Sequence, residues 1–303
     1  MFHRYVSALL CVVFLATGVG RADESFFESN GVKIHYLVDG KGEPVLLIHG
    51  FATNARLQWM VSGIFKALAK DHLVIAMDVR GHGDSGKPSD PKKYGTEMVE
   101  DAVRLLDHLK IKKAHVVGYS MGALITGKLL GTHPDRLLSA TLGGTGIFPE
   151  GVKLPPNLEK LAQSLEQGKG MSSILTAMTP PGKSKPSAAT IRAANRLTAG
   201  DNGKVLAAVV RSWNTLGVTR GKLEENKVPT LALIGTADPF KEGFEFMKEG
   251  MANLKIVTID GATHISAPSN PKFISSLRSF LAENSPRKKK EKKEPTKAPG
   301  FAE

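Results

Sequence analysis

Short apolar runs alternate with longer amphipathic stretches along most of this chain. Most of these runs are apolar at nearly every position, which predicts strands buried on both faces of a sheet. The runs lie at residues 26–29, 32–38, 45–48, 73–77, 114–117, 140–142, 231–234 and 256–259. Between the first two, Asn30-Gly31 predicts a β-hairpin, because both residues tolerate positive φ.

Helical patterns fill the gaps between these runs, at residues 57–70, 96–110, 121–133 and 271–282. The last pattern has Asn270 as N-cap and Pro271 at the first helical position, where the missing N–H costs nothing. Such alternation predicts the α/β class, with a mainly parallel, eight-stranded sheet and helices on both faces.

One stretch interrupts this alternation. Residues 148–223 contain no convincing buried strand but four helical segments, at residues 157–167, 172–178, 188–197 and 204–213. We therefore predict a helical cap at residues 147–226, inserted into one core domain made of residues 23–146 and 227–284. Its aliphatic residues favour either an apolar acyl pocket or simple packing of the cap on the core.

The two ends of the chain differ from the core. Residues 1–22 have a basic start, an uncharged apolar run and small residues at Gly20 and Ala22, which predicts a signal peptide cleaved after Ala22. An uncleaved anchor is the alternative. Export to the periplasm or outside the cell follows from the first interpretation. Residues 285–303 are dense in charge, which predicts a disordered solubilising tail or one that contacts anionic lipid or envelope polymer.

The charge and cysteine content exclude some classes of function. Of the net charge of +12, the N-terminal segment carries +2 and the tail +4, so the body holds only +6. No basic motif suggests a folded nucleic-acid surface, and we expect no nucleic-acid partner. The single cysteine, Cys11, excludes a disulfide framework and any cysteine-based metal site.

The candidate chemistry centres on Gly118-Tyr119-Ser120-Met121-Gly122, a G-x-S-x-G segment between an apolar run and a helical pattern. This context is typical of a nucleophile elbow, in which a tight turn projects the serine hydroxyl above a sheet. The alternative is a glycine-rich turn with a passive serine.

A serine nucleophile needs a base and an orienting acid. His264 follows the last predicted strand, and Asp238 follows the run at residues 231–234. Loops after parallel strands meet at one edge of a sheet, so these residues are expected to meet Ser120. Asp260 is a second candidate for the acid, although it stands only four residues before His264. The other histidines near predicted elements have structural explanations; they are His49, His82, His115 and His133.

Together, these residues and their order Ser120, Asp238, His264 resemble the serine-nucleophile, capped branch of the α/β-hydrolase fold superfamily, over about residues 25–284. By this resemblance the segment beginning His49-Gly50-Phe51 is an oxyanion loop, with the N–H groups of Phe51 and Met121 as donors. The segment 78–85 is similar to the family's D-x-R-G-x-G-x-S turn and is expected to be structural.

The resemblance implies a small-molecule ester substrate, an acyl-enzyme, and no metal or cofactor. Haloalkane dehalogenases and epoxide hydrolases of this fold carry a carboxylate where Ser120 stands, so both are disfavoured. Lactones and thioesters remain open as substrates. A cofactor-free perhydrolase, a carbon–carbon bond hydrolase and a non-catalytic binding protein remain as alternatives.

Overall fold

The structure is a computed structural model that describes residues 22–153, 155–179, 182, 184–198, 200–240 and 243–286. The predicted signal peptide, except Ala22, and most of the predicted tail lie outside the described residues. Within the described ranges, no helix is both long enough and apolar enough to cross a membrane.

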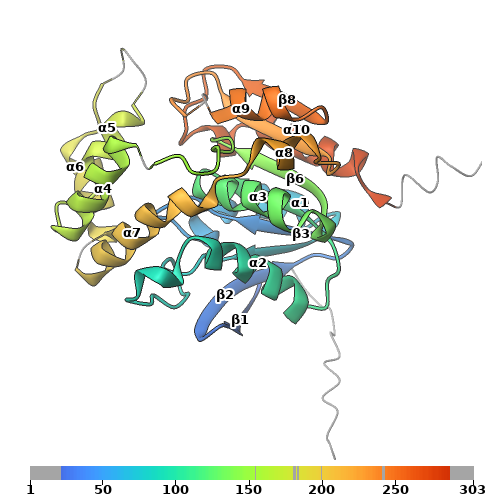
Figure 1. Cartoon of the computed structure of the whole chain (residues 1–303), viewed down its shortest axis with the longest axis horizontal. Helices are drawn as coiled ribbons and strands as arrows, with labels where there is room; N and C mark the ends of the chain where they lie inside the picture. Colours follow the sequence, from blue (N-terminus) through green and yellow to red (C-terminus); the bar gives the residue numbers. More distant parts are fainter. Residues whose placement is uncertain are drawn as a thin grey trace, which may run out of the picture.

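An eight-stranded sheet forms the centre of the molecule, in the order β1-β2-β4-β3-β5-β6-β7-β8 (Figure 1). β1 and β2 form the hairpin predicted at Asn30-Gly31, and β2 also pairs antiparallel with β4. The remaining neighbours are parallel. The strands are β1 (Asp23–Ser29), β2 (Val32–Asp39), β3 (Glu43–Ile48), β4 (His72–Met77), β5 (Ala114–Tyr119), β6 (Leu137–Gly143), β7 (Thr230–Gly235) and β8 (Leu254–Ile259).

Helices cover both faces of this sheet. The principal ones are α1 (Ile64–Leu68), α2 (Thr96–His108), α3 (Met121–Thr132), α9 (Gly243–Gly250) and α10 (Pro271–Glu283). Side chains alternate along each strand, so Leu46 and Ile48 pack in the core cluster that includes α2 and α3. Val45 and Leu47 point the other way, into the cluster that includes α1 and α10. The predicted α/β class and mainly parallel sheet are confirmed.

A group of helices is inserted between β6 and β7. They are α4 (Pro156–Glu166), α5 (Ser172–Ala177), α6 (Ala188–Leu197), α7 (Asp201–Ser212), η4 (Trp213–Leu216) and α8 (Arg220–Glu224). The first three stand to one side of the sheet (Figure 1), whereas Leu216 of η4 and Leu223 of α8 pack in the core cluster. α7 joins them to the core, because Val205 and Val209 pack in the core cluster while Leu206 and Val210 pack with α4 and α5. The insertion therefore shares a helix with the core rather than standing free of it.

The two ends of the insertion run side by side. The Val218 N–H donates to the Phe148 carbonyl at 2.9 Å, and the Glu150 N–H donates to the Val218 carbonyl at 3.1 Å. These bonds form a short parallel bridge at the base of the insertion.

The single helix predicted at residues 57–70 is wrong. A π-helical turn, η1 (Arg56–Met60), is separated from the short α1 by Gly63, whose φ of 79° ends regular helical geometry. Apolar residues continue at nearly helical spacing across this region, so the sequence pattern did not indicate the interruption at Gly63.

Two other details differ from the prediction. α9 was not predicted, because it is only eight residues long and has glycine at both ends. β8 is an edge strand with several exposed positions, among them Ile256, whereas the sequence suggested strands buried on both faces.

Candidate active site

Ser120 lies in the sharp turn between β5 and α3. Its φ of 54° and ψ of −117° place its backbone in a region that residues other than glycine rarely adopt. The Ser120 N–H donates to the Gly143 carbonyl at 2.8 Å, which ties the turn to the neighbouring strand. The Ser120 side chain is only half-buried, so its hydroxyl remains accessible.

The two glycines of this turn are required by close backbone contacts. A Cβ on Gly118 would lie 2.0 Å from the Gly122 carbonyl oxygen, and a Cβ on Gly122 would lie 2.0 Å from the Ile48 carbonyl oxygen. Both distances are far below van der Waals contact. The chain can form this turn because both positions are glycine. A side chain at either position would prevent α3 from approaching β5 and β3 so closely.

The structure brings Ser120, His264 and Asp238 together, although they follow three different strands. The Ser120 hydroxyl lies 2.9 Å from His264 Nε2, and His264 Nδ1 lies 2.8 Å from Asp238 Oδ2. Asp238 and His264 are 2% and 5% exposed, so solvent screens the pair little. A carboxylate can only accept, so Nδ1 carries the proton and Nε2 is free to accept from the serine hydroxyl.

The rival acid does not take this position. Asp260 lies on the surface, whereas Asp238 contacts the imidazole and also accepts the Phe240 N–H at 2.9 Å through Oδ1. Among the rival bases, His115 is buried in β5 and bonds Ser139 through Nδ1 at 2.7 Å. The geometry therefore favours Asp238 and His264 over both rivals.

The two N–H groups predicted to hold an oxyanion are those of Phe51 and Met121. In the part of the chain that the structure describes, neither N–H has a hydrogen-bond acceptor. Met121 directly follows Ser120, and a Cβ on Gly50 would lie 3.3 Å from the Ser120 Cβ, so both peptides adjoin the hydroxyl-bearing residue. Free N–H groups in such a place can bind a negatively charged oxygen.

His49 orients one of these peptides. Its Nε2 accepts the Val79 N–H at 3.0 Å, so the proton is on Nδ1, which donates to the Gly50 carbonyl at 2.7 Å. Burial lowers the pKa of His49, which keeps the ring neutral. Because C=O and N–H point in opposite directions across a trans peptide, this bond also fixes the direction of the Phe51 N–H.

The Asp78 carboxylate organises the segment predicted to be structural. Its Oδ1 accepts a hydrogen bond from the Ala55 N–H at 2.7 Å. Its Oδ2 accepts hydrogen bonds from the Asp84 N–H and from His35 Nδ1, both at 2.9 Å. Asp78 thus connects the turn after β4 with the loop that carries Phe51.

Similarity to known proteins agrees with this architecture. Residues 43–170 match the sequence model of the α/β hydrolase fold family. A solved structure of a hydrolase from Pseudomonas aeruginosa PA01 superposes with a TM-score of 0.72 at 25% identity, covering 86% of this chain and 98% of the other. The chain has the α/β-hydrolase fold.

Sequence relatives within this superfamily are more diverse. The dihydrolipoyllysine-residue acetyltransferase component of the acetoin cleaving system of Pseudomonas putida is 39% identical over 101 residues, which are 33% of this chain and 26% of that protein. Epoxide hydrolase 3 of Siraitia grosvenorii is 32% identical over 128 residues, 42% of this chain and 40% of that protein. The chain thus spans less than half the length of these curated relatives.

Several residues around the site of this α/β-hydrolase were not predicted from sequence. The Tyr119 hydroxyl donates to the His264 carbonyl at 2.6 Å and holds the loop that carries the imidazole. The Phe240 ring stands edge-on to His264 with centroids 4.9 Å apart, and the Trp213 ring contacts Phe51 at 5.3 Å. Of these residues, only Tyr119 could have been singled out from the sequence, because it stands in the elbow motif directly before Ser120.

His82 lines the same region without carrying charge. Its ring contacts those of His49 and Phe51, with centroids 5.3 and 5.8 Å apart. Burial, reinforced by the neighbouring His49, lowers its pKa to about 3. The two histidine rings beside Phe51 are therefore neutral at neutral pH.

Proposed function

We propose that this protein is a serine hydrolase that cleaves carboxylic esters through an acyl-enzyme. The observation that carries the proposal is the unbroken path of short contacts from the Ser120 hydroxyl through His264 to Asp238. The direction of proton transfer is set by Asp238, whose carboxylate can only accept a hydrogen bond from Nδ1–H and so leaves Nε2 free to take a proton. The path therefore runs in the direction that removes a proton from the serine.

In the proposed reaction, the Ser120 oxygen attacks the ester carbonyl carbon while its proton passes to His264 Nε2. The carbonyl oxygen becomes an oxyanion and binds the N–H groups of Phe51 and Met121, each worth roughly 3–4 kcal/mol in comparable sites. Collapse breaks the bond to the alcohol, which leaves with the proton from His264. Water then attacks the acyl group in the same way, which releases the acid and restores Ser120.

The surroundings of the site support an apolar substrate. Phe51, Trp213 and Phe240 pack against the apolar cluster formed by α4, α5 and α7. Such a lining favours aliphatic or aromatic acyl groups, because it offers them burial without unpaired polar atoms. We therefore propose esters with an apolar acyl group, with lactones and thioesters as related substrates.

We further propose that the protein is exported, because residues 1–22 have the pattern of a signal peptide. N-terminal sequencing of protein recovered from the medium or periplasm tests this. A mature chain beginning at Asp23 is expected, and an unprocessed chain retained with the cells would contradict it.

The catalytic proposal is tested by ester turnover. A panel of p-nitrophenyl esters of increasing acyl length, with lactones and peracid formation from peroxide added, is compared across the wild-type protein, Ser120→Ala and Ser275→Ala. Ser275 is exposed on α10 and serves as the matched control. We expect Ser120→Ala to lower kcat by about 10⁴ or more and Ser275→Ala to leave it unchanged.

Three results would overturn this proposal. Full ester turnover by Ser120→Ala would place the nucleophile elsewhere. Absence of turnover of every ester and lactone in the panel by the wild-type protein would favour a binding protein. Activity confined to peracid formation would favour a perhydrolase.

A further inference from the structure

A cluster of three potential metal ligands lies outside the proposed active site. Glu24 on β1, His35 on β2 and Asp84 in the turn after β4 each offer one ligand atom, and these atoms lie within 4.8 Å of one another. Glu24 and Asp84 are exposed, whereas the His35 side chain is 1% exposed. Two exposed carboxylates thus stand beside a buried imidazole.

The imidazole of His35 is oriented for metal binding. Its Nδ1 lies 2.9 Å from Asp78 Oδ2, and a carboxylate can only accept, so Nδ1 carries the proton. In the neutral ring, Nε2 therefore presents a lone pair toward Glu24 and Asp84. Among the described residues this buried Nε2 has no hydrogen-bond partner. A histidine fixed by a carboxylate behind it is the usual arrangement of a metal-ligating histidine.

We propose that Glu24, His35 and Asp84 bind one divalent transition-metal ion of the Zn²⁺ type. One imidazole nitrogen and two carboxylate oxygens are ligands that Zn²⁺ accepts, with water completing a tetrahedral shell. Such a shell needs ligand atoms roughly 3.3–3.6 Å apart, given metal–ligand distances of about 2.0–2.2 Å. Glu24 Oε1 already lies 3.6 Å from His35 Nε2, and rotation of the exposed Asp84 side chain brings in the third ligand.

A simple ion pair accounts for the cluster less well. If His35 were protonated, its Nε2–H would be expected to donate to Glu24, but 3.6 Å is too long for a hydrogen bond. The Arg56 guanidinium contacts the other oxygen of Glu24, Oε2, so Oε1 remains available to a cation.

Asp78 prepares two of the three ligands at once. The oxygen that fixes His35, Oδ2, also accepts the Asp84 backbone N–H at 2.9 Å. A bound ion would therefore join β1, β2 and the turn after β4 around one preorganised carboxylate. Because the ion binds the folded state alone, it must raise the free energy of unfolding by RT ln(1 + L/Kd), where L is the concentration of free ion, so that Tm increases with the logarithm of that concentration above Kd.

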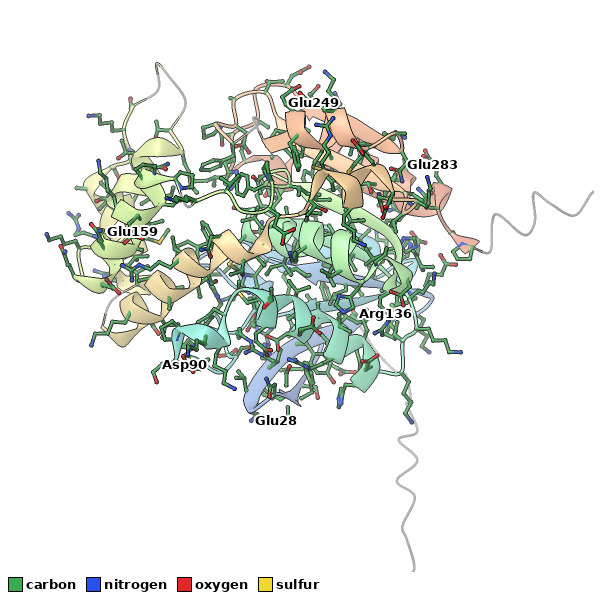
Figure 2. All side chains as sticks on the ribbon, in the orientation of Figure 1. Glu28, Asp90, Arg136, Glu159, Glu249 and Glu283 are labelled. Carbon is green, nitrogen blue, oxygen red and sulfur yellow. The ribbon has the colours of Figure 1, made fainter. Side chains whose placement is uncertain are left out.

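The test measures Zn²⁺ binding and thermal unfolding of metal-stripped protein. Isothermal titration with Zn²⁺, and the visible absorption of Co²⁺ as a substitute ion, are compared for the wild type, Glu24→Gln, Asp84→Asn and Glu28→Gln. Glu28 is the matched control, because it is an exposed glutamate of the same strand, near the tip of the β1–β2 hairpin (Figure 2). Ser120→Ala is included as a second control, because Ser120 lies at the proposed active site and not in this cluster.

We expect one Zn²⁺ per chain, a Tm that rises with Zn²⁺, and intense Co²⁺ absorption of a four-coordinate site. Glu24→Gln and Asp84→Asn should each weaken binding at least about tenfold, since loss of a ligand costs no less than loss of its supporting partner. Glu28→Gln and Ser120→Ala should bind as the wild type does. Equal affinity in all variants, no binding, or loss of binding in Ser120→Ala would overturn the proposal, whatever the outcome for ester turnover.

Discussion

Ser120 occupies a strained backbone conformation that the surrounding residues hold in place. Gly118 and Gly122 leave room for the carbonyl groups that press against the turn, and the Gly143 carbonyl accepts the Ser120 N–H. The strain is thereby offset by contacts elsewhere and fixes the direction of the hydroxyl.

The role assigned to Asp238 is tested by replacing each candidate acid with asparagine. In Asp238→Asn, the amide no longer requires Nδ1 to carry the proton, so His264 adopts the tautomer that cannot accept from Ser120. We expect kcat for ester hydrolysis to fall on the order of 10⁴, with the fold retained by circular dichroism. Asp260→Asn is the matched control and should leave kcat unchanged; the reverse pattern would assign the acid to Asp260.

For single residues, the sequence was sufficient to predict those that meet at the site but not those that support them. G-x-S-x-G and the order Ser120, Asp238, His264 point to chemistry because each residue type has a defined role. Tyr119 and Phe240 act through contacts across the sheet, at 2.6 and 4.9 Å from His264 groups. Because such contacts join residues far apart in the chain, no local sequence pattern predicts them.

The elements that position these residues depend on buried polar contacts as well as on the apolar core. Arg80, in the turn after β4, donates through Nε to Asp101 Oδ2 at 2.6 Å and through Nη2 to Oδ1 at 2.5 Å. Asp101 is on α2, and both side chains are fully buried. Arg80 Nη1 also donates to the Lys93 carbonyl at 2.7 Å. The pair thus joins α2 to the turn that follows β4.

Removal of this contact should be costly. Asp101→Ala leaves the buried Arg80 guanidinium with only Glu97, 3.4 Å away, as a counter-charge. We expect this to lower the free energy of unfolding by about 3 kcal/mol, the lower end of the cost of breaking a buried pair. Asp107→Ala is the matched control on the same helix, because its pair with Arg136 is exposed and should contribute less than about 1 kcal/mol. Urea denaturation of both variants checks this, and equal losses would contradict it.

Elements were predictable where one local pattern determined them. The apolar runs of β3 to β7 are buried strands, and Asn270-Pro271 begins α10 as expected. The helix predicted at residues 57–70 failed because Gly63 and a π-helical turn interrupt a stretch whose apolar spacing continues. α9 was missed because eight residues bounded by glycines give too little periodicity.

For the whole molecule, Asp78 links the sheet edge, the turn after β4 and the Phe51 loop. Burial alone would raise the pKa of its carboxyl, but the hydrogen bond from His35, the nearby His49 and two backbone N–H groups lower it to about 2. The ordinary value is 3.8, so the unfolded chain binds the proton more readily. The stabilisation from Asp78 is therefore complete above about pH 4 and is lost as pH falls toward 2.

This contribution is measurable as a pH dependence of stability. Between pH 5 and about pH 2, the wild type should lose about 2 kcal/mol more of its free energy of unfolding than Asp78→Asn does. Asp135→Asn, at an exposed position, should follow the wild type. Denaturant titrations at several pH values check this, and parallel curves for wild type and Asp78→Asn would refute it.

The acyl group that the proposed site would accept depends on the arrangement of the whole molecule, which is why the sequence predicted an ester but not its acyl group. The apolar wall beside the site comes from η4, the loop after β7 and the inserted helices together. The shape of this wall depends on how α7 packs the insertion against the core. No pattern within a single segment of the sequence predicts that packing.

The central claim is that Ser120 is a nucleophile activated by His264, and covalent trapping tests it most directly. The wild-type protein and Ser120→Ala are treated with a fluorophosphonate, and intact mass and peptide mapping locate any adduct. We predict one adduct per chain on Ser120 in the wild type and none in Ser120→Ala. An unlabelled wild-type protein, or an adduct that persists in Ser120→Ala, would contradict the account.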